Sequence, residues 1–168
     1  MIKLKNVLEN RIEEYVIYLD LDGVVCDFMS AMKSRYPNSS EIKKNREEYQ
    51  KLVDGMDVKF WSDMPWMSDG KILWNFVKDM NVEILSAPAD SEASVEGKKL
   101  WVRKNLSPTI KINLSKAENK KDYAAINHIL IDDKPENIDG WISEEGEGIL
   151  HTTAHDSIKQ LKLILEIQ

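Results

Sequence analysis

A short apolar run, Val16–Leu19, leads directly into two aspartates, Asp20 and Asp22. The β-branched and aromatic side chains of this run predict a strand buried on both faces, as strands of parallel sheets are. Alternate residues of an extended segment face the same way, so both carboxylates would point into one space, and Gly23 would let the chain turn beside them. Because two such groups at the end of a buried strand repel each other and lose hydration, the segment indicates a functional role.

Similar apolar segments with polar ends recur along the chain. They span residues 82–88, 109–115 and 128–133, with a weaker candidate at 148–151. Helical patterns fall between them: Ser68 is a candidate cap for a helix whose apolar stripe includes Ile72, segment 91–105 would turn Leu100 inward, and segment 158–165 ends the series. Strands that alternate with helices predict an α/β fold with a parallel sheet, right-handed crossovers and helices on both faces.

The interval between the first strand and Val82 exceeds fifty residues, which is too long for one crossover loop. Asn38 followed by Glu41 offers a capping box for one charged helix, which Gly55 could terminate. We therefore predict a small helical cap at residues 30–80, inserted after the first strand. The core domain would then consist of residues 1–29 and 81–168.

The composition narrows the class of protein. The formal net charge of −6 over 168 residues argues against a nonspecific nucleic-acid binder, because phosphate backbones attract positive surfaces. Cys26 is the only cysteine, so the chain forms no intrachain disulfide and no thiolate zinc site, and a cytoplasmic location is favoured. The charged N-terminal segment and the lack of any stretch of about 18 apolar residues predict neither export nor a membrane span.

The polar residues at the predicted strand ends suggest a specific chemistry. In open parallel sheets the carboxyl ends of the strands share one crevice, which would here collect Asp20, Asp22, Ser86, Asp132 and Asp133. Four clustered carboxylates need a cation, and all-oxygen ligands favour Mg²⁺, which can also accept a phosphate. One carboxylate could then attack phosphorus while a second, protonated, donates to the leaving oxygen.

These same segments resemble a known family. "DLDGV", "ILSAP", a lysine in "ENKKDYA" and "ILIDDKPEN" resemble the four ordered motifs of the haloacid dehalogenase (HAD) superfamily, whose core is a Rossmann-like α/β fold. "DGVVCDF", "GKKLWVRKNL" and "LIDDKPENIDGW" are similar to segments of the 5'(3')-deoxyribonucleotidases. The resemblance implies a magnesium-dependent phosphomonoesterase, a 5'-nucleotidase that acts on small nucleoside monophosphates, preferably deoxyribonucleotides, through an aspartyl-phosphate intermediate.

The resemblance also implies catalytic roles for individual residues. Asp20 would be the nucleophile, and Asp22 the acid that protonates the leaving nucleoside and then activates water. Ser86 and the amide of Ala87 would hold phosphate oxygens, although the nucleotidases commonly have Thr-Ser-Pro at this position. Lys120 would be the motif lysine, chosen by its spacing over Lys116 and Lys121, which lie in the same segment.

The metal ligands implied by the resemblance are Asp20, the backbone carbonyl of Asp22 and one aspartate of the Asp132–Asp133 pair. We favour Asp133 as the direct ligand and Asp132 as its neighbour. The reverse order stays open.

Substrate contacts are less constrained by the sequence. Phe28, Phe60 and Trp61 are candidates to contact a nucleobase, although aromatic residues in a small helical module also form its core. Basic runs such as Lys98–Lys99 are most often solvated helix faces, yet they keep a polynucleotide 3'-phosphatase as an alternative. A noncatalytic binding or regulatory domain with the same fold is a second alternative. The base and sugar preference, the position of the phosphate and a homodimer all stay open.

Overall fold

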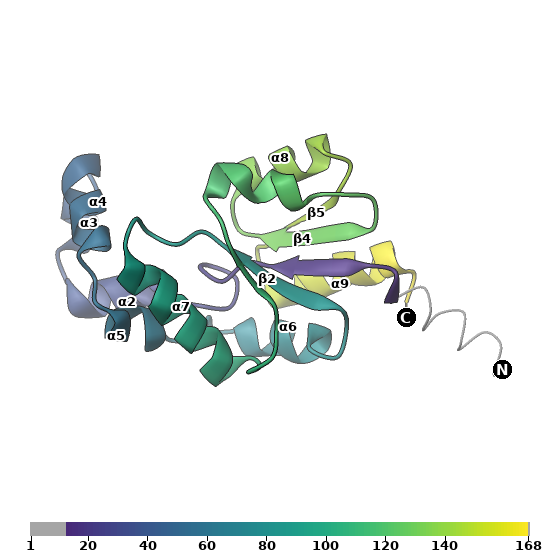
Figure 1. Cartoon of the computed structure of the whole chain (residues 1–168), viewed down its shortest axis with the longest axis horizontal. Helices are drawn as coiled ribbons and strands as arrows, with labels where there is room; N and C mark the ends of the chain where they lie inside the picture. The colour runs from purple at the N-terminus through teal and green to yellow at the C-terminus, as the bar shows by residue number, and fades with distance from the viewer. Residues whose placement is uncertain (1–12, 168) are drawn as a thin grey trace.

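The computed structural model describes residues 13–167, and its centre is a parallel sheet. Within these residues five strands pair in the order β3-β2-β1-β4-β5 (Figure 1). They are β1 (Val16–Leu19), β2 (Val82–Ser86), β3 (Ile112–Leu114), β4 (His128–Asp132) and β5 (Glu147–Leu150). All five are among the predicted strands, and the parallel α/β fold is confirmed. The order reverses at β1, so the crevice beyond β1, β2 and β4 is where such sheets bind ligands.

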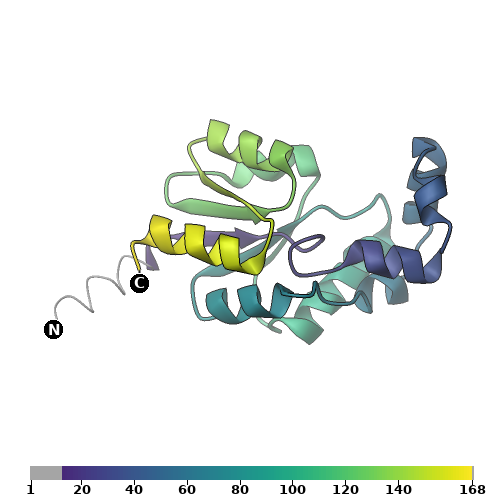
Figure 2. The same ribbon diagram turned by 180° about the vertical axis from the view of Figure 1, so that it is seen from behind.

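Helices cover both faces of the sheet, as predicted (Figures 1 and 2). One face packs against α6 (Gly70–Val77), α7 (Glu92–Asn105) and α9 (Ala154–Leu165). The other face packs against α8 (Pro135–Ser143) and the 3₁₀ helix η1 (Ala117–Tyr123). This three-layer arrangement explains why the strands are apolar on both faces.

Successive side chains of β1 alternate between the two faces of the sheet and so enter the two helical layers in turn. Ile17 and Leu19 are buried in the larger core with α6, α7 and α9. Tyr18 points to the opposite face, where its ring lies 5.2 Å from that of Trp141 in an edge-on contact. Ile17, Tyr18 and Leu19 are therefore covered on both faces of the sheet, and Asp20 directly after them is also buried.

The helical insert after β1 is confirmed, and it lies beyond the carboxyl ends of the strands (Figure 1). It begins with α2 (Phe28–Arg35), α3 (Ser39–Ile42), α4 (Arg46–Asp54) and α5 (Val58–Ser62). The prediction of one charged helix capped by Asn38 is wrong. Asn38 makes no side-chain capping bond, whereas Asn45 accepts a hydrogen bond from the Glu48 amide and starts a new helix there. Gly55 ends α4, as predicted.

Helix α6 also lies between β1 and β2 in the sequence, but it packs against the sheet beside α9 (Figure 2). Its N-cap is Asp69 rather than the predicted Ser68, and Asp69 accepts a hydrogen bond from the Ala154 amide at 2.6 Å. Ile72 and Leu100, expected to face inward, are exposed. The domain boundaries at residues 30 and 80 stay a prediction.

Two expectations concern the chain's relation to membranes. No helix in the described part of the chain has the length and apolar character needed to cross a bilayer. The predicted absence of an export segment concerns the N-terminus, and residues 1–12 lie outside the described residues.

The end of the insert is fixed tightly on α7. The Trp101 indole on α7 donates a hydrogen bond to the Met64 carbonyl at 2.8 Å, and the Trp66 indole donates to Asn105 Oδ1. Gly97 on α7 touches α5 so closely that a Cβ there would overlap Trp61 and lie 2.7 Å from the Val58 carbonyl oxygen. Helix α5 and the loop after it are therefore held by the core helix α7.

Replacing Gly97 by alanine is expected to lower the free energy of unfolding by about 1–3 kcal/mol, because the new methyl group must displace backbone atoms of α5. Urea unfolding measures this loss. The matched control is Gly140→Ala on α8, where the new Cβ would make an ordinary contact at 3.7 Å with Lys121. In a helix interior alanine is the better residue by about 0.5–1 kcal/mol, so the control should be neutral or stabilising. Equal stability of the two variants would contradict the close packing of α5 on α7.

Candidate active site

Three carboxylates converge at the carboxyl ends of the two central strands. Asp20 follows β1, Asp132 ends β4 and Asp133 comes next, and one oxygen of each lies within 4.8 Å of the others. β1 and β4 are paired with Leu19 opposite Ile131, which brings Asp20 and Asp132 to the same level. Asp20 is only 4% exposed and Asp132 is fully buried. Three of the four carboxylates predicted to converge therefore meet in the fold, whereas the Asp22 side chain is not part of this group and pairs with Lys98.

Lys120 supplies the positive charge inside this acidic cluster. Its ammonium lies 2.9 Å from Asp20 Oδ1 and 2.6 Å from Asp132 Oδ2, and its side chain is almost completely buried. Burial alone would lower the pKa of Lys120, but the charges of Asp20 and Asp132 outweigh burial and raise the pKa. Of the three candidate lysines, Lys120 reaches the cluster, whereas Lys121 is half-exposed and Lys116 lines a groove outside it.

Asp132 and Asp133 differ in their hydrogen-bond partners. Asp132 accepts bonds from the Lys134 amide at 2.9 Å, the Asn137 amide group at 2.9 Å and Lys120. Asp133 Oδ1 is buried and has no hydrogen-bond partner in the described part of the chain. Burial, and then the charges of Asp20 and Asp132, raise the pKa of Asp133 to about 6. This difference supports the order favoured from the sequence, with Asp133 as the direct ligand of a cation.

The acidic cluster fits a hard divalent cation such as Mg²⁺. Its donors are all carboxylate oxygens, and their mutual repulsion would be relieved by a positive ion. Two of these oxygens, Asp20 Oδ1 and Asp133 Oδ1, are buried without a hydrogen-bond partner among the described residues, although Asp20 Oδ1 is ion-paired with Lys120. Gly23 makes room for the cluster, because its φ of +81° belongs to the left-handed region and a Cβ there would lie 2.5 Å from Asp133 Oδ2. Among the described side chains, Asp20 and Asp133 would hold the ion, with Asp132 as their neighbour.

Adding Mg²⁺ is expected to raise the melting temperature of the wild-type chain. A ligand that binds only the folded state at about 100 times its Kd stabilises it by about 2.7 kcal/mol. Asp133→Asn should remove most of this shift, whereas Asp139→Asn, which changes an exposed carboxylate on α8, should keep it. Differential scanning calorimetry with Mg²⁺ and with EDTA measures the effect. A wild-type shift no larger than that of Asp133→Asn would contradict the assigned site.

A second polar group lies beside the acidic cluster and centres on Lys98. Its ammonium forms a salt bridge with Asp22 Oδ2 and donates hydrogen bonds to Ser86 Oγ at 3.0 Å and to the Ala87 carbonyl at 2.9 Å. The expectation that the basic run Lys98–Lys99 is a solvated face is wrong for Lys98, which is fully buried. The helical period could have shown this, because Ser94 and Trp101 place Lys98 on the buried face of α7.

The three aromatic candidates form one cluster. Phe60 and Trp61 on α5 are buried, and the Phe28 ring stacks on that of Trp61 with centroids 5.6 Å apart. Phe28 itself is only partly buried. Their packing against one another accounts for Phe60 and Trp61 as core residues, so contact with a substrate stays a prediction for all three.

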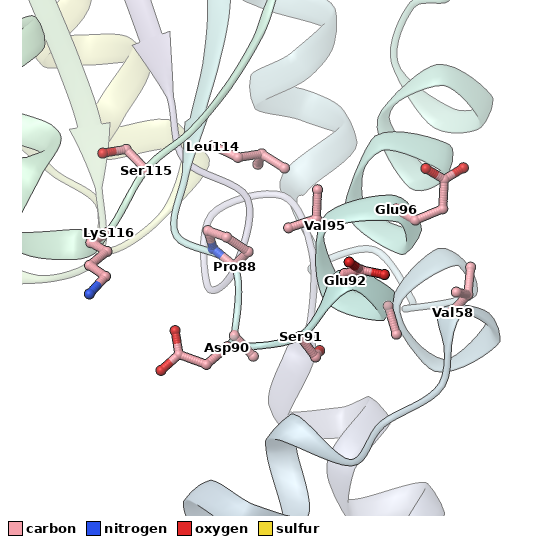
Figure 3. Close-up of a pocket in the computed structure, with 12 residues that line it drawn as sticks. Val58, Pro88, Asp90, Ser91, Glu92, Val95, Glu96, Leu114, Ser115 and Lys116 are labelled. Carbon is pink, nitrogen blue, oxygen red and sulfur yellow. The ribbon is translucent and has the colours of Figure 1, made fainter.

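A groove of about 1000 Å³ opens where the loop after β2 meets the first turns of α7 and the end of β3 (Figure 3). Its wall includes Pro88, which follows the Ser86–Ala87 pair, and Lys116, which precedes η1. The side chains of Asp90 and Glu92 also border it, whereas the clustered aspartates do not line it. The groove is therefore a neighbouring surface with an acidic border rather than the acidic cluster itself.

Comparison with known proteins identifies the fold. No protein-family model matches the sequence, and no curated protein matches it at a significant level. Among solved structures, the HAD-hydrolase YfnB from Bacillus subtilis bound to magnesium matches with a TM-score of 0.57 at 13% identity, over 91% of this chain and 99% of that chain. A HAD-superfamily hydrolase of subfamily IA from Geobacter sulfurreducens matches with a TM-score of 0.55 at 11% identity, over 88% and 95%.

A haloacid dehalogenase-like hydrolase from Streptococcus pneumoniae is similar to the same extent, with a TM-score of 0.54 at 11% identity, over 92% of this chain and 98% of that chain. Identities this low carry the fold and not the substrate. The Rossmann-like part of the prediction is thereby confirmed together with the helical insert after β1. This chain has the fold of the HAD-superfamily hydrolases and carries an acidic cluster of Asp20, Asp132 and Asp133 at the carboxyl edge of its sheet.

Proposed function

We propose that the chain is a magnesium-dependent phosphomonoesterase that hydrolyses nucleoside monophosphates, preferably deoxyribonucleoside 5'-monophosphates. The observation that carries the proposal is the meeting of Asp20, Asp133 and Lys120 at one point of the fold, with Asp22 and Ser86 at the adjacent strand ends. This set provides a nucleophile, a proton donor, a hydroxyl for phosphate oxygens and a fixed cation. Such a combination is what transfer of a phosphoryl group requires.

The reaction proceeds in two steps on the chain's own residues. Asp20 attacks phosphorus, the bond to the nucleoside oxygen breaks, and Asp22 gives that oxygen its proton. Water then attacks the phosphoryl group on Asp20 while Asp22 takes up a proton from it, which releases inorganic phosphate and restores the Asp20 carboxylate and the protonated Asp22. Bound Mg²⁺ supplies positive charge that lets carboxylate and phosphate approach each other. Lys120 offsets charge on the transferring group.

Two features support a small nucleotide rather than a polynucleotide. The segments "DGVVCDF" and "LIDDKPENIDGW", which resemble the nucleotidases, contribute Asp22 and Asp133 to the site region. The groove beside Ser86 has room for a small molecule but is bordered by Asp90 and Glu92, which would repel a long polyanion.

A substrate screen tests the proposal. Phosphate release is measured from ribo- and deoxyribonucleoside 5'- and 3'-monophosphates and from a 3'-phosphorylated oligonucleotide, each with Mg²⁺ and with EDTA. The highest kcat/KM is expected for a deoxyribonucleoside 5'-monophosphate, and only with Mg²⁺. Preference for the oligonucleotide would establish the 3'-phosphatase instead. p-Nitrophenyl phosphate is included as a general phosphatase substrate. Hydrolysis of this ester alone would disprove nucleotides as the substrate class, and no hydrolysis of any ester would favour a noncatalytic binding or regulatory domain.

A further inference from the structure

Lys98 is a second buried lysine whose charge the two-step reaction does not use. It lies midway along α7, and none of its surface is exposed. A buried ammonium is costly unless it is paired and hydrogen-bonded. Its charged partner is Asp22, which follows β1 and whose side chain is 30% exposed. Because burying this charge costs stability and its charged partner is Asp22, we infer that Lys98 acts on Asp22.

The hydrogen bonds of Lys98 show how it acts. An ammonium has three N–H donors and no acceptor, and here the three acceptors are Asp22 Oδ2, Ser86 Oγ and the Ala87 carbonyl. All of its donors are therefore engaged within the protein. A lysine that bound substrate phosphate directly would keep at least one donor free, so this geometry favours a role through the side chains it holds.

We propose that Lys98 is a positioning residue that fixes Asp22 for proton transfer to the leaving group and orients the Ser86 hydroxyl toward the phosphate. Because Lys98 holds Asp22 Oδ2, the rotation of the carboxylate is fixed. Oδ1 is buried, has no hydrogen-bond partner among the described residues, and is the oxygen left for proton transfer. Because Ser86 Oγ accepts from Lys98, its own hydrogen is free to donate to a phosphate oxygen.

The surroundings of Lys98 fix its own position. Its ammonium lies 5.6 Å from the centroid of the Trp61 ring, at a distance where a cation is attracted to an aromatic face. The neighbouring Gly97 allows α7 to touch α5 at Trp61 and Val58. Lys98 therefore couples the insert to the loop after β2, and one rigid side chain aligns two groups from different strands.

The test compares two phosphate esters whose leaving groups differ in their need for a proton. It rests on the phosphatase activity proposed above. The ratio kcat/KM reports the first chemical step, in which a nucleoside oxygen needs a proton but p-nitrophenolate does not. Lys98→Met should therefore lower kcat/KM for both esters unequally. The fold-loss for a deoxyribonucleoside monophosphate should exceed the fold-loss for p-nitrophenyl phosphate by about tenfold or more, since a positioned acid contributes about 10²–10⁴-fold. The control Lys99→Met, next in the chain and partly exposed, should change neither value.

A double mutant identifies the side chain through which Lys98 acts. In the Asp22→Asn background, Lys98→Met should add no further selectivity between the two esters, because the positioned group is already lost. Equal losses for both esters in Lys98→Met, or an undiminished effect in the Asp22→Asn background, would overturn the positioning role. If Lys98→Met does not fold, Lys98→Gln keeps two N–H donors without the charge and takes its place.

Urea unfolding of the same four chains gives a readout independent of turnover. Lys98→Met should lower the urea midpoint more when it is made in the wild-type chain than when it is made in the Asp22→Asn variant. In the wild-type chain the substitution leaves the Asp22 carboxylate without its partner, whereas in Asp22→Asn that charge is already absent. Additive midpoints would show that the pairing is absent and would overturn the proposal. A wild-type chain that hydrolyses neither ester, with non-additive midpoints, would instead disprove the phosphatase function and the catalytic role of Lys98 while confirming the pair.

Discussion

Replacing Asp20 by asparagine is expected to reduce magnesium-dependent hydrolysis of p-nitrophenyl phosphate by about 10⁴-fold or more, the scale seen when a catalytic nucleophile is removed. Asparagine keeps the shape of the side chain but cannot form the phosphoryl ester. Asp20 is almost buried beside Lys120, Asp132 and Asp133. The amide also removes one of three repelling charges, so the folded state should lose little stability.

Steady-state kinetics with Mg²⁺ and thermal unfolding of the same samples measure both parts of this prediction. Asp139→Asn is the matched control, because it makes the same chemical change at an exposed position of α8 and should retain full activity. An Asp20→Asn variant that folds and turns over at the wild-type rate would exclude Asp20 as the nucleophile. Loss of activity together with loss of folding would instead identify a structural carboxylate.

The second large effect is expected from Lys120→Met. Methionine keeps an unbranched apolar side chain but leaves Asp20 and Asp132 without the cation that lies between them. Removing one partner of a buried ion pair costs about 3–5 kcal/mol. Activity should also fall by about 10²–10³-fold, as it does when a fixed group that stabilises developing charge is lost. Urea unfolding and kcat measure the two effects, and Mg²⁺ should restore part of the stability.

Lys121→Met serves as the control because Lys121 is the next residue in the chain and its side chain is half-exposed. A surface change of this kind normally alters stability by about 0.5 kcal/mol or less. If Lys121→Met lost activity while Lys120→Met kept it, the choice of motif lysine would be wrong. The pair of variants therefore also resolves an ambiguity that spacing in the sequence left open.

The sheet was predictable because its information is local. The three central strands β1, β2 and β4 are short, mainly apolar runs with a polar end, and each carries that pattern within a few residues, as Val16–Leu19 does before Asp20. The same reasoning anticipated that Asp20, Asp132 and Asp133 would meet, because parallel strands end at one edge. Helix boundaries were less certain: Asn38 and Asn45 are both good caps, and Asn45 starts α4.

The insert was less predictable than the sheet. The sequence indicated a helical segment after β1 but not that α6 would lie on the sheet beside α9, nor that Phe60 and Trp61 would be buried against each other. Aromatic side chains pack equally well into a core or against a ligand, and composition does not distinguish the two. The contact of Gly97 with α5 holds Trp61 in the core, and this contact joins segments that are about forty residues apart in the sequence.

By itself, the sequence determined the strands, their polar ends and the acidic cluster, because pairing in a parallel sheet brings the carboxyl ends of the strands to one edge. Only the tertiary structure decided which lysine enters the cluster, which of Asp132 and Asp133 keeps an oxygen without a hydrogen bond, and that Lys98 is buried against Asp22 and Ser86. Lysine side chains are long and flexible, so their burial depends on acceptors supplied by remote segments, and that arrangement exists only once the helices have packed.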